Sequence, residues 1–395
     1  MTARTAHARA RVAVVTRQWG TQEDEAVVAT RLVAGALARH AAVDVVHLVA
    51  PSEATGPVAD SVFTVHRIPL RGARPLTGAL VRTALGATGG QGLPAAAAAL
   101  LEHYGGEAPD AADLLERLAP DAVVLAGSHH PYDLAVLGRR GEAGRPRVVA
   151  LPLLGAVPPA PATGVRRVLE RADAVALAHP GEGDVLAAAC PAGCVGQLVP
   201  LDLAFAINRS ATQSRLFGVR FFGRYVLLLR GFPPGGARFE RSMTHEVLRR
   251  VVRGVSVAEV DGEHWRISDD ENTLELPVNP SRVNLWRLMA FALFTIDVRP
   301  PGPVGREAIE SMLLGTPVLV PEPSAAMQHA AAASGGLWYR DPGELFDAAR
   351  ALMSRPLRAR LGTQGREYAE AHHGRMDDFV ERVRRLVLGP AERLA

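Results

Sequence analysis

Residues 11–49 read RVAVVTRQWGTQEDEAVVATRLVAGALARHAAVDVVHLV, and this stretch decides the fold class. It begins with a short apolar, β-branched run over 11–16, which is typical of a buried strand. Apolar residues at helical spacing follow over 26–40, and a second apolar run covers 43–49. A strand, a helix and a strand within about 40 residues form a βαβ unit, so the sequence predicts a parallel sheet.

The same alternation continues to residue 199, lapses over 200–223 and restarts at 225. We therefore predict two doubly wound α/β domains, 1–205 and 206–375, and a C-terminal helix over 376–395 that packs back on the first domain. Strands are predicted at 61–68, 121–126, 147–151, 174–178, 195–199, 225–229, 255–260, 296–298 and 317–320. Helices are predicted at 95–118, 132–140, 165–172, 181–189, 242–253, 285–294, 306–314, 342–353, 356–371 and 376–387.

The charge inventory excludes several chemistries. All 44 basic residues are arginine, against 41 acidic residues, so the formal net charge is +3. Without lysine there is no P-loop lysine, no Schiff base and no lysine general base. The basic residues form no concentrated block, so nucleic-acid binding is not expected. A hydrophobic fraction of 48% is that of a globular chain and excludes a disordered one.

Cysteine usage and hydropathy limit the compartment and the cofactors. Cys190 and Cys194 are the whole thiol inventory, too few for a disulfide framework or a complete zinc site. No stretch of about 20 apolar residues is present, and the N-terminus lacks the pattern of a signal peptide. We expect a cytoplasmic protein without a bound metal, which does not span a membrane but is free to attach to a membrane surface through its arginines.

Residues 306–320, REAIESMLLGTPVLV, resemble the donor-site helix and the following strand of the retaining GT-B glycosyltransferases of family 4. Further matches to this family follow one another in the correct order along the chain. They cover residues 171–178, 181–186, 199–202, 224–238 and 341–373.

The resemblance implies a GT-B fold, with two Rossmann-like domains facing across a cleft. It also implies a nucleotide-diphospho-sugar donor on the C-terminal domain, an acceptor on the N-terminal domain and transfer with retention. No metal and no cofactor is expected. The acceptor, whether a small molecule, a lipid or a glycan, is left open. Closure of the two domains would exclude water from the reaction.

The donor site implied by the resemblance centres on the start of the 306–314 helix. Glu310 stands at the family's second motif glutamate, which accepts hydrogen bonds from ribose hydroxyls. Backbone N–H groups near Gly305, Arg306 and Glu307 would point at a phosphate or sugar, since a helix N-terminus offers donors and partial positive charge. The alternatives are a surface carboxylate at Glu310 and an ordinary helix that begins at a glycine.

The resemblance is incomplete at this site. The family's first glutamate stands eight positions before the second, and this chain has Gly302 there. Glu307 lies one turn from Glu310 and cannot simply replace the missing residue. The family also holds the diphosphate with an arginine and a lysine on the loop after the second domain's first strand. Arg230 and Arg238 are the candidates for these two positions, or else they are exposed loop arginines.

Three residues of the first domain complete the candidate site. Family members often have a histidine close to the transferred sugar, after a strand of this domain. Here His129 is the first choice and His130 the alternative, because adjacent side chains point in different directions. Trp19 lies in the opening loop, where it either stacks on an acceptor or, as the tryptophans generally do, packs in the core. The opening loop itself has three acids, Glu23 to Glu25, in place of the family's Gly-Gly pair.

Two functions are therefore compatible with the sequence. The first is an active glycosyltransferase, specifically a hexosyltransferase, and the retention of Glu310, Arg230 and His129 favours it. The second is a catalytically inactive relative that binds a nucleotide or serves as a partner or scaffold subunit. The absence of the first glutamate, of the lysine and of the Gly-Gly loop favours this one. Between the two, the sequence favours the enzyme.

Overall fold

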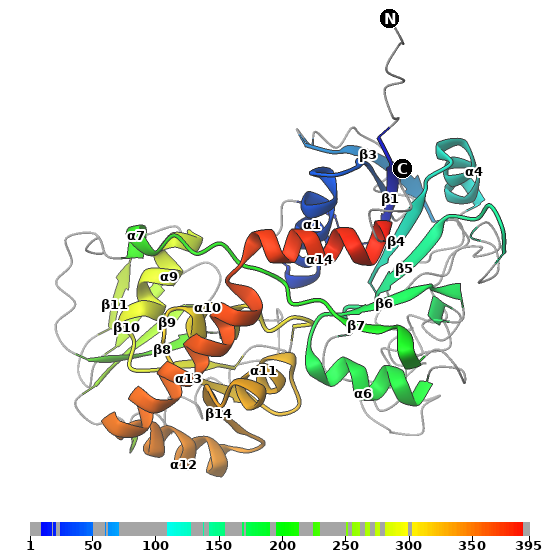
Figure 1. The fold of residues 1–395 in the computed structure, drawn as a ribbon. Coiled ribbons are helices and arrows are strands. Elements are labelled where there is room, and N and C mark those ends of the chain that lie inside the picture. The colour runs from blue at the N-terminus through cyan, green and yellow to red at the C-terminus, as the bar shows by residue number, and fades with distance from the viewer. Residues whose placement is uncertain are drawn as a thin grey trace, which may run out of the picture. The chain divides into compact units, whose positions relative to one another are not determined.

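The computed structural model describes residues 9–389 apart from 18, 21–23, 50–59, 61, 71–108, 128–136, 138–141, 155–167, 170, 190–194, 213–223, 230–249, 252–254, 261–264, 269–272, 277–280 and 299–301. The expected helices at 132–140 and 242–253 lie mostly outside these described residues, and so does half of the helix expected at 165–172. The chain divides into two compact units, unit 1 with residues 1–203 and 377–395, and unit 2 with residues 204–376 (Figure 1).

Unit 1 is built on a seven-stranded parallel sheet with the strand order β3-β2-β1-β4-β5-β6-β7. The first strand pairs with β2 on one side and β4 on the other, so the direction of winding reverses at β1. The strands are β1 (Arg11–Thr16), β2 (Ala42–Val49), β3 (Thr64–Pro69), β4 (Ala122–Ala126), β5 (Arg147–Leu151), β6 (Ala174–Leu177) and β7 (Leu198–Pro200). The helices described within residues 1–203 are α1 (Glu25–Ala38), α4 (Pro109–Leu118), α6 (Pro180–Ala189) and a 3₁₀ turn, η3 (Val195–Gln197).

The sequence prediction was wrong over 195–197, where η3 replaces the first part of the expected strand.

The sequence prediction also missed a structural role for an acid of the opening loop. The Asp24 side chain accepts hydrogen bonds from the backbone N–H groups of Ala26 at 2.8 Å and Val27 at 3.4 Å. An aspartate at this position caps the first turn of α1. At least one of the three acids of that loop therefore has a structural role.

Unit 2 is also a seven-stranded sheet, in the order β11-β10-β9-β8-β12-β13-β14. Its strands are β8 (Tyr225–Leu229), β9 (Ser256–Val260), β10 (Trp265–Ser268), β11 (Thr273–Leu276), β12 (Thr295–Asp297), β13 (Val318–Pro321) and β14 (Gly336–Tyr339). All neighbours are parallel except β10, which is antiparallel to β9 and β11. The helices described for this unit are α7 (Arg209–Thr212), α9 (Arg282–Phe291), α10 (Arg306–Leu313), α11 (Ala325–Ala333), α12 (Pro342–Leu352) and α13 (Arg355–His373).

The central strand β8 shows why this sheet is covered on both faces. Val226 and Leu228 belong to one hydrophobic cluster, which also includes Phe294. Leu227 and Leu229 belong to a second cluster. Successive side chains of a strand point to opposite faces, so a continuous apolar run such as YVLLL is satisfied only when both faces are buried.

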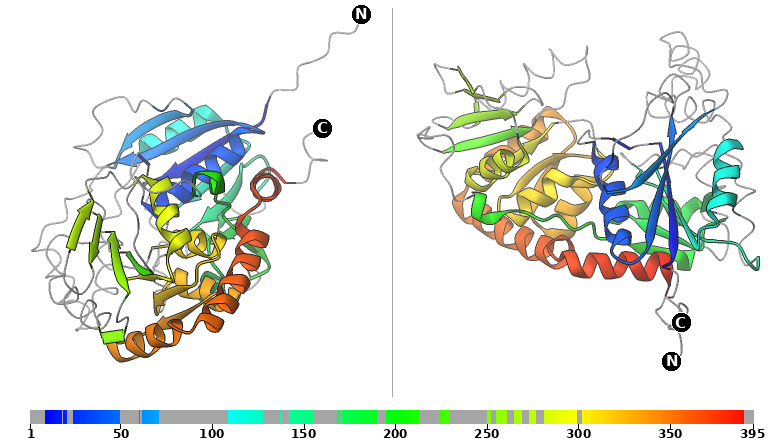
Figure 2. Two further views of the ribbon diagram at one scale, coloured as in Figure 1. Left: turned by 90° about the vertical axis from the view of Figure 1, so that its left-hand side faces the viewer. Right: turned by 90° about the horizontal axis from the view of Figure 1, so that it is seen from above.

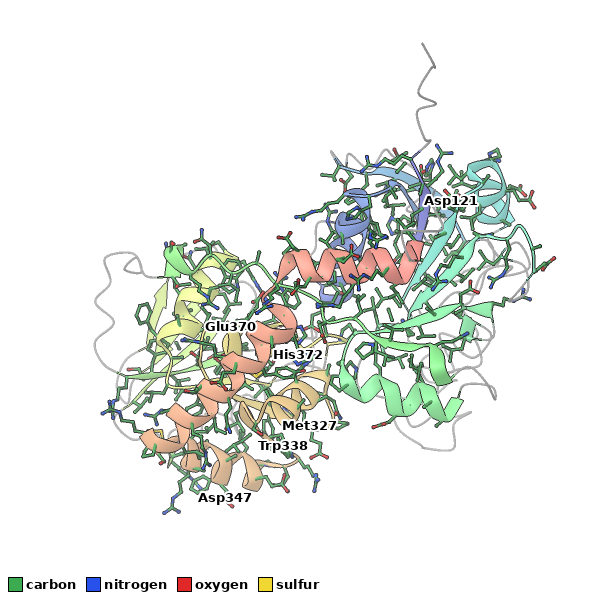
Figure 3. The ribbon with its side chains drawn as sticks, in the orientation of Figure 1. Asp121, Met327, Trp338, Asp347, Glu370 and His372 are labelled. Carbon is green, nitrogen blue, oxygen red and sulfur yellow. The ribbon has the colours of Figure 1, made fainter. Side chains whose placement is uncertain are left out.

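The last helix, α14 (Met376–Leu388), belongs to unit 1 from Asp377 onward (red in Figure 2). Arg39 lies 3.1 Å from the carboxylate of Asp377. The Arg147 guanidinium donates to the backbone oxygen of Leu386 at 3.0 Å. The chain thus crosses from unit 1 to unit 2 near residue 203 and returns near residue 376. The preceding helix, α13, carries the labelled Glu370 and His372 (Figure 3).

Candidate functional site

The sheet of unit 2 has a switch point, where the direction in which successive strands are added reverses. Strand β8 pairs with β9 on one side and with β12 on the other, so the winding reverses between β8 and β12. Helix α10 follows β12 in the chain and begins beyond the carboxyl end of that strand. Ligands of doubly wound sheets bind at such a switch point. The start of α10 is therefore the natural candidate site of this unit.

Gly305 is the residue before α10, and the structure requires glycine there for two reasons. Its φ is 68° and its ψ is 38°, in the left-handed region. A Cβ atom on Gly305 would lie 2.7 Å from the backbone nitrogen of Ala326 and 2.8 Å from its Cα. The start of α10 is thus packed directly against the start of α11.

We expect Gly305→Ala to destabilise unit 2 more than Gly315→Ala does. Gly315 is also left-handed, with φ at 78°, but there a Cβ would meet the guanidinium of Arg366, a side chain that can move. The left-handed conformation alone costs a non-glycine residue roughly 1–2 kcal/mol. Thermal unfolding of both variants checks the order. Equal losses would show that the backbone of α11 yields to the new methyl group.

Glu310 lies one turn into α10 and is completely buried. Its Oε1 accepts hydrogen bonds from Nε of Arg306 at 2.9 Å and from Nε of Arg282 at 3.1 Å. Its Oε2 pairs with Nη2 of Arg282. Glu307, at the first turn, accepts from Nη1 of Arg282 at 2.8 Å. We call Arg282, Arg306, Glu307 and Glu310 the arginine–glutamate cluster.

Local structure explains how Arg282 reaches both carboxylates. Its neighbour Ser281 caps α9, because its hydroxyl accepts from the N–H of Asn284, and this places Arg282 at the first position of the helix. On α10, Glu307 and Glu310 are three residues apart and lie on one face. One guanidinium, with its fork of donors, can then hold two carboxylates at once.

The electrostatics of the cluster depend on this pairing. Burial alone would lower the pKa of Arg282, but the negative charges of Glu307 and Glu310 outweigh burial, and the pKa is raised. The guanidinium is therefore charged at every accessible pH. Two positive and two negative charges balance within the cluster. Buried carboxylates need such partners, because an unpaired buried charge is strongly destabilising.

Sequence reasoning singled out Arg306, Glu307 and Glu310 but missed Arg282. The available signal was the acidic pair at spacing three on a helix that also carries Ile309 and Met312 for the core. Two carboxylates that are buried together need a positively charged side chain as a partner. Among 44 arginines, however, the sequence gives no reason to choose one that lies 25 residues away.

The other residues predicted for the site do not belong to the arginine–glutamate cluster. His129, His130, Arg230, Arg238, Cys190 and Cys194 lie outside the described residues. Trp19 belongs to unit 1 and is only 7% exposed. Its ring meets Phe63 edge-on with centroids 5.4 Å apart, and the Arg31 guanidinium lies 4.9 Å from its centroid. Trp19 is thus part of the packing of unit 1, and stacking on an acceptor would require Arg31 to move.

Unit 1 contains a buried acid that sequence reasoning missed. Glu182, in the first turn of α6, accepts the backbone N–H of Leu154 at 2.8 Å and that of Ala178 at 2.6 Å. An acid three residues after the cap position of a helix commonly reaches back in this way, which is the signal that the sequence offered. The ring of the adjacent His179 is buried too, with Nε2 3.4 Å from the oxygen of Leu154.

Burial shifts both groups toward their neutral forms. It raises the pKa of Glu182 from 4.5 to about 8, against the opposing effect of the backbone N–H donors. It lowers the pKa of His179 from 6.5 to about 4. Between pH 4.5 and 6.5 the folded and unfolded states each hold one proton on this pair. Unfolding then takes up no net proton on these two groups, so they give the free energy of unfolding no pH dependence in this range. Above pH 6.5 only the folded state keeps a proton, on Glu182.

We therefore expect the free energy of unfolding of unit 1 to fall by about 2 kcal/mol as the pH rises from 6.5 to 8. Glu182→Gln should remove this fall, because glutamine does not titrate. Urea unfolding followed by the fluorescence of Trp19, with Trp265, Trp286 and Trp338 replaced by phenylalanine, measures it. A slope that persists unchanged in Glu182→Gln would assign the fall to another group.

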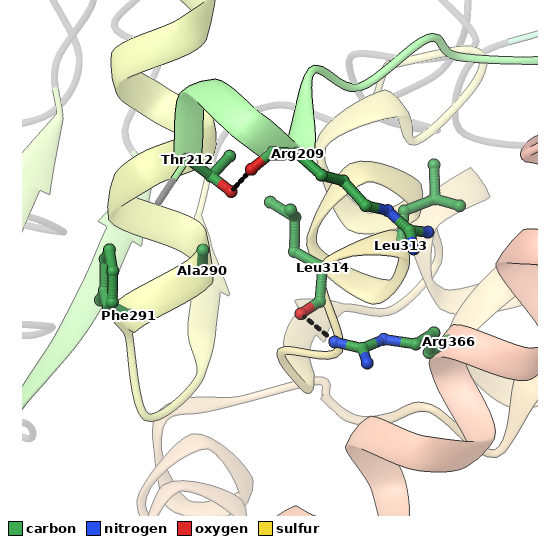
Figure 4. A pocket seen from close by; sticks show the side chains of 7 residues that line it. All are labelled: Arg209, Thr212, Ala290, Phe291, Leu313, Leu314 and Arg366. Atoms are coloured by element: carbon green, nitrogen blue, oxygen red, sulfur yellow. Dashed lines mark hydrogen bonds between the residues drawn. The ribbon is translucent and has the colours of Figure 1, made fainter. Parts of the chain in front are cut away.

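Unit 2 has a pocket at the C-terminal end of α10, the end away from Gly305 (Figure 4). It has a volume of about 280 Å³, with Leu313 at the end of α10 and the following Leu314 beside Ala290 and Phe291 of α9. Arg209, Thr212 and Arg366 complete its wall. Arg366 donates to the backbone oxygen of Leu314 at 2.8 Å, and Arg209 pairs with Glu370 at 2.6 Å. Because the pocket adjoins the C-terminal end of α10, it is separate from the site at Gly305.

Within the part of the chain that the structure describes, no three side chains of His, Cys, Asp or Glu are grouped as a metal site would need. None of the helices described there is long and apolar enough to cross a bilayer.

Comparison with protein-family models gives no match, and comparison with curated proteins gives none either. Solved structures do match over almost the whole chain. Sucrose-phosphate synthase from Thermosynechococcus elongatus aligns with a TM-score of 0.59 at 16% identity, covering 96% of this chain and 98% of that one. HepE of Anabaena, in complex with UDP and glucose, aligns with a TM-score of 0.56 at 12% identity, covering 94% and 97%. WaaG, a glycosyltransferase involved in lipopolysaccharide biosynthesis, aligns with a TM-score of 0.53 at 14% identity, covering 96% and 100%.

The chain has the GT-B fold. Its two Rossmann-like units and the two seven-stranded sheets agree with this likeness, which confirms the fold class expected from the sequence.

Proposed function

We propose that this protein is a glycosyltransferase that moves a sugar, with retention and without a metal, from a nucleotide-diphospho-sugar to an acceptor. The observation that carries the proposal is the position of Glu310. It is a buried carboxylate one turn beyond a left-handed glycine, on the helix that begins at the switch point of unit 2. The GT-B fold and the resemblance of residues 306–320 to family 4 support the same conclusion.

In the proposed complex, the donor diphosphate lies at the start of α10, where helix N–H groups and the helix dipole favour negative charge. Glu310 accepts hydrogen bonds from the ribose hydroxyls, as the family resemblance implies. Arg230 and Arg238 add positive charge at the diphosphate, and His129 or His130 contacts the transferred sugar. Unit 1 binds the acceptor. Stabilisation of the leaving diphosphate is then the main catalytic contribution.

UDP is the first nucleotide to try, since HepE is known in complex with UDP and glucose. A thermal-shift panel of UDP, GDP, ADP and dTDP with the full chain tests the proposal, because a ligand of the folded state raises the melting temperature by mass action. We expect one base to give a clear shift, and sugar release from the matching donor to survive EDTA. If no nucleotide shifts the melting temperature, the proposal fails.

A second candidate is a catalytically inactive protein that binds a nucleotide or a partner subunit. Two observations favour it. The loop before α10 has Gly302 where the family carries its sugar-contacting glutamate. In addition, the carboxylate of Glu310 is covered by the protein's own arginines. Nucleotide binding without sugar release from any donor, and without transfer, would support this candidate over the enzyme.

A further inference from the structure

Arg306 covers the carboxylate that the proposed function assigns to the ribose. It is the first residue of α10, and its Nε lies 2.9 Å from Oε1 of Glu310, one turn further along the helix. Its side chain is 13% exposed, and its guanidinium carbon lies 5.7 Å from the ring centroid of Phe205. A ribose hydroxyl that approaches Oε1 must therefore displace Arg306.

The two arginines of the cluster contact its carboxylates differently. Arg282 reaches Glu307 and both oxygens of Glu310. Arg306 reaches Glu310 by its Nε. When Arg306 leaves, Glu310 keeps the charge of Arg282 as compensation. The reverse movement, with Arg282 leaving, would remove the partner of two buried carboxylates at once and is far less favourable.

Arg306 also lies where a diphosphate would need it. A side chain at the first position of a helix is adjacent to the N–H groups that bind a phosphate at that end. A diphosphate carries more negative charge than one carboxylate and accepts paired hydrogen bonds from a guanidinium. It can therefore compete successfully with Glu310 for Arg306, while a ligand without phosphate cannot.

We propose that Arg306 is a specificity residue that exchanges partners when the donor binds. In the free protein it covers Glu310. When a nucleoside diphosphate arrives, the guanidinium moves to the diphosphate and frees one of the two hydrogen bonds that Oε1 of Glu310 accepts, so that a ribose hydroxyl takes that place while Arg282 keeps its own bond. The site thus selects ligands that carry both groups, and it disfavours a nucleoside alone. This inference rests on the proposed function, since it assumes that the donor lies at the start of α10.

Calorimetric titration of the full chain with UDP and with uridine tests the exchange in Arg306→Gln. If the thermal-shift panel selects another base, its diphosphate and nucleoside take their place. Loss of a charge-assisted contact should weaken UDP binding about 10-fold to 100-fold. Uridine should bind about 3-fold to 10-fold more tightly than it does to the wild type, because it no longer competes with Arg306. The two ligands thus respond in opposite directions.

Arg209→Gln is the matched control. It also removes one arginine from an Arg–Glu pair of unit 2, but by the pocket at the other end of α10. Both ligands should bind it as they bind the wild type. Arg306→Lys replaces Arg306→Gln as the test variant if the glutamine variant fails to fold. It keeps the charge without the paired donors, so UDP should lose less affinity than in Arg306→Gln.

Equal weakening of UDP and uridine would overturn the exchange and leave Arg306 with a purely structural role. Unchanged or tighter binding of UDP would overturn it as well. If the wild-type protein binds no nucleotide at all, that result overturns the proposed function, and this inference with it.

Discussion

Arg282→Met is expected to lower the melting temperature of unit 2 by about 10 °C or more. The substitution keeps the apolar stem but removes the guanidinium that holds Glu307 and Glu310. Two carboxylates, one of them fully buried, then lose their shared partner. Breaking a buried pair in this way costs about 3–5 kcal/mol, which for a unit of this size corresponds to such a shift. Differential scanning calorimetry measures the change.

The cause of this loss can be checked separately. Arg340→Met is the control, because Arg340 pairs with Glu322 on the exposed surface. Exposed pairs contribute little, so its melting temperature should hardly change. Similar losses in the two variants would show that the cluster does not stabilise unit 2.

The second large effect concerns nucleotide affinity. We expect Glu310→Gln to weaken UDP, or the base that the protein prefers, by about 10-fold to 100-fold, since hydrogen bonds to a charged group contribute about 1.5–3 kcal/mol. The substitution preserves shape and removes the acceptor charge proposed for the ribose. Isothermal titration calorimetry gives the dissociation constants.

Glu307→Gln separates binding from stability. It removes a charge beside the same guanidinium but keeps the backbone N–H of the helix start. Both variants should unfold at lower temperature than the wild type, whereas UDP affinity should fall far more in Glu310→Gln. Wild-type affinity in Glu310→Gln would remove Glu310 from the donor site.

The apolar pattern predicted those elements that are buried on both faces. The run at 225–229 forms β8 at the expected residues, and the predicted helix at 306–314 corresponds to α10 within one residue. Periodicity did not reveal β10 and β11, because each alternates apolar and polar residues over only four positions and lacks the continuous apolar run of an equally short strand such as β6. The helix α11 was missed too. Its AAMQHAAAA sequence is dominated by alanine, so it shows no clear apolar face.

The candidate site was predictable only in part, for a physical reason. Glu310 and Gly305 could be recognised because they lie in one continuous segment that resembles a known motif. The partner of Glu310 could not, because the contact with Arg282 depends on how α9 packs beside α10. The covering of Glu310 by Arg306 likewise depends on side-chain direction within the first turn of α10. Sequence spacing alone allowed that contact without requiring it.

We propose that the nucleotide-sugar binds at the start of α10. Hydrogen–deuterium exchange of the full chain, with and without saturating UDP-glucose or the donor that the panel selects, tests it most directly. We expect slower exchange of the amides of residues 304–310 and unchanged exchange around Leu313 and Leu314. Binding that protects the pocket at the C-terminal end of α10, and leaves 304–310 unprotected, would contradict it.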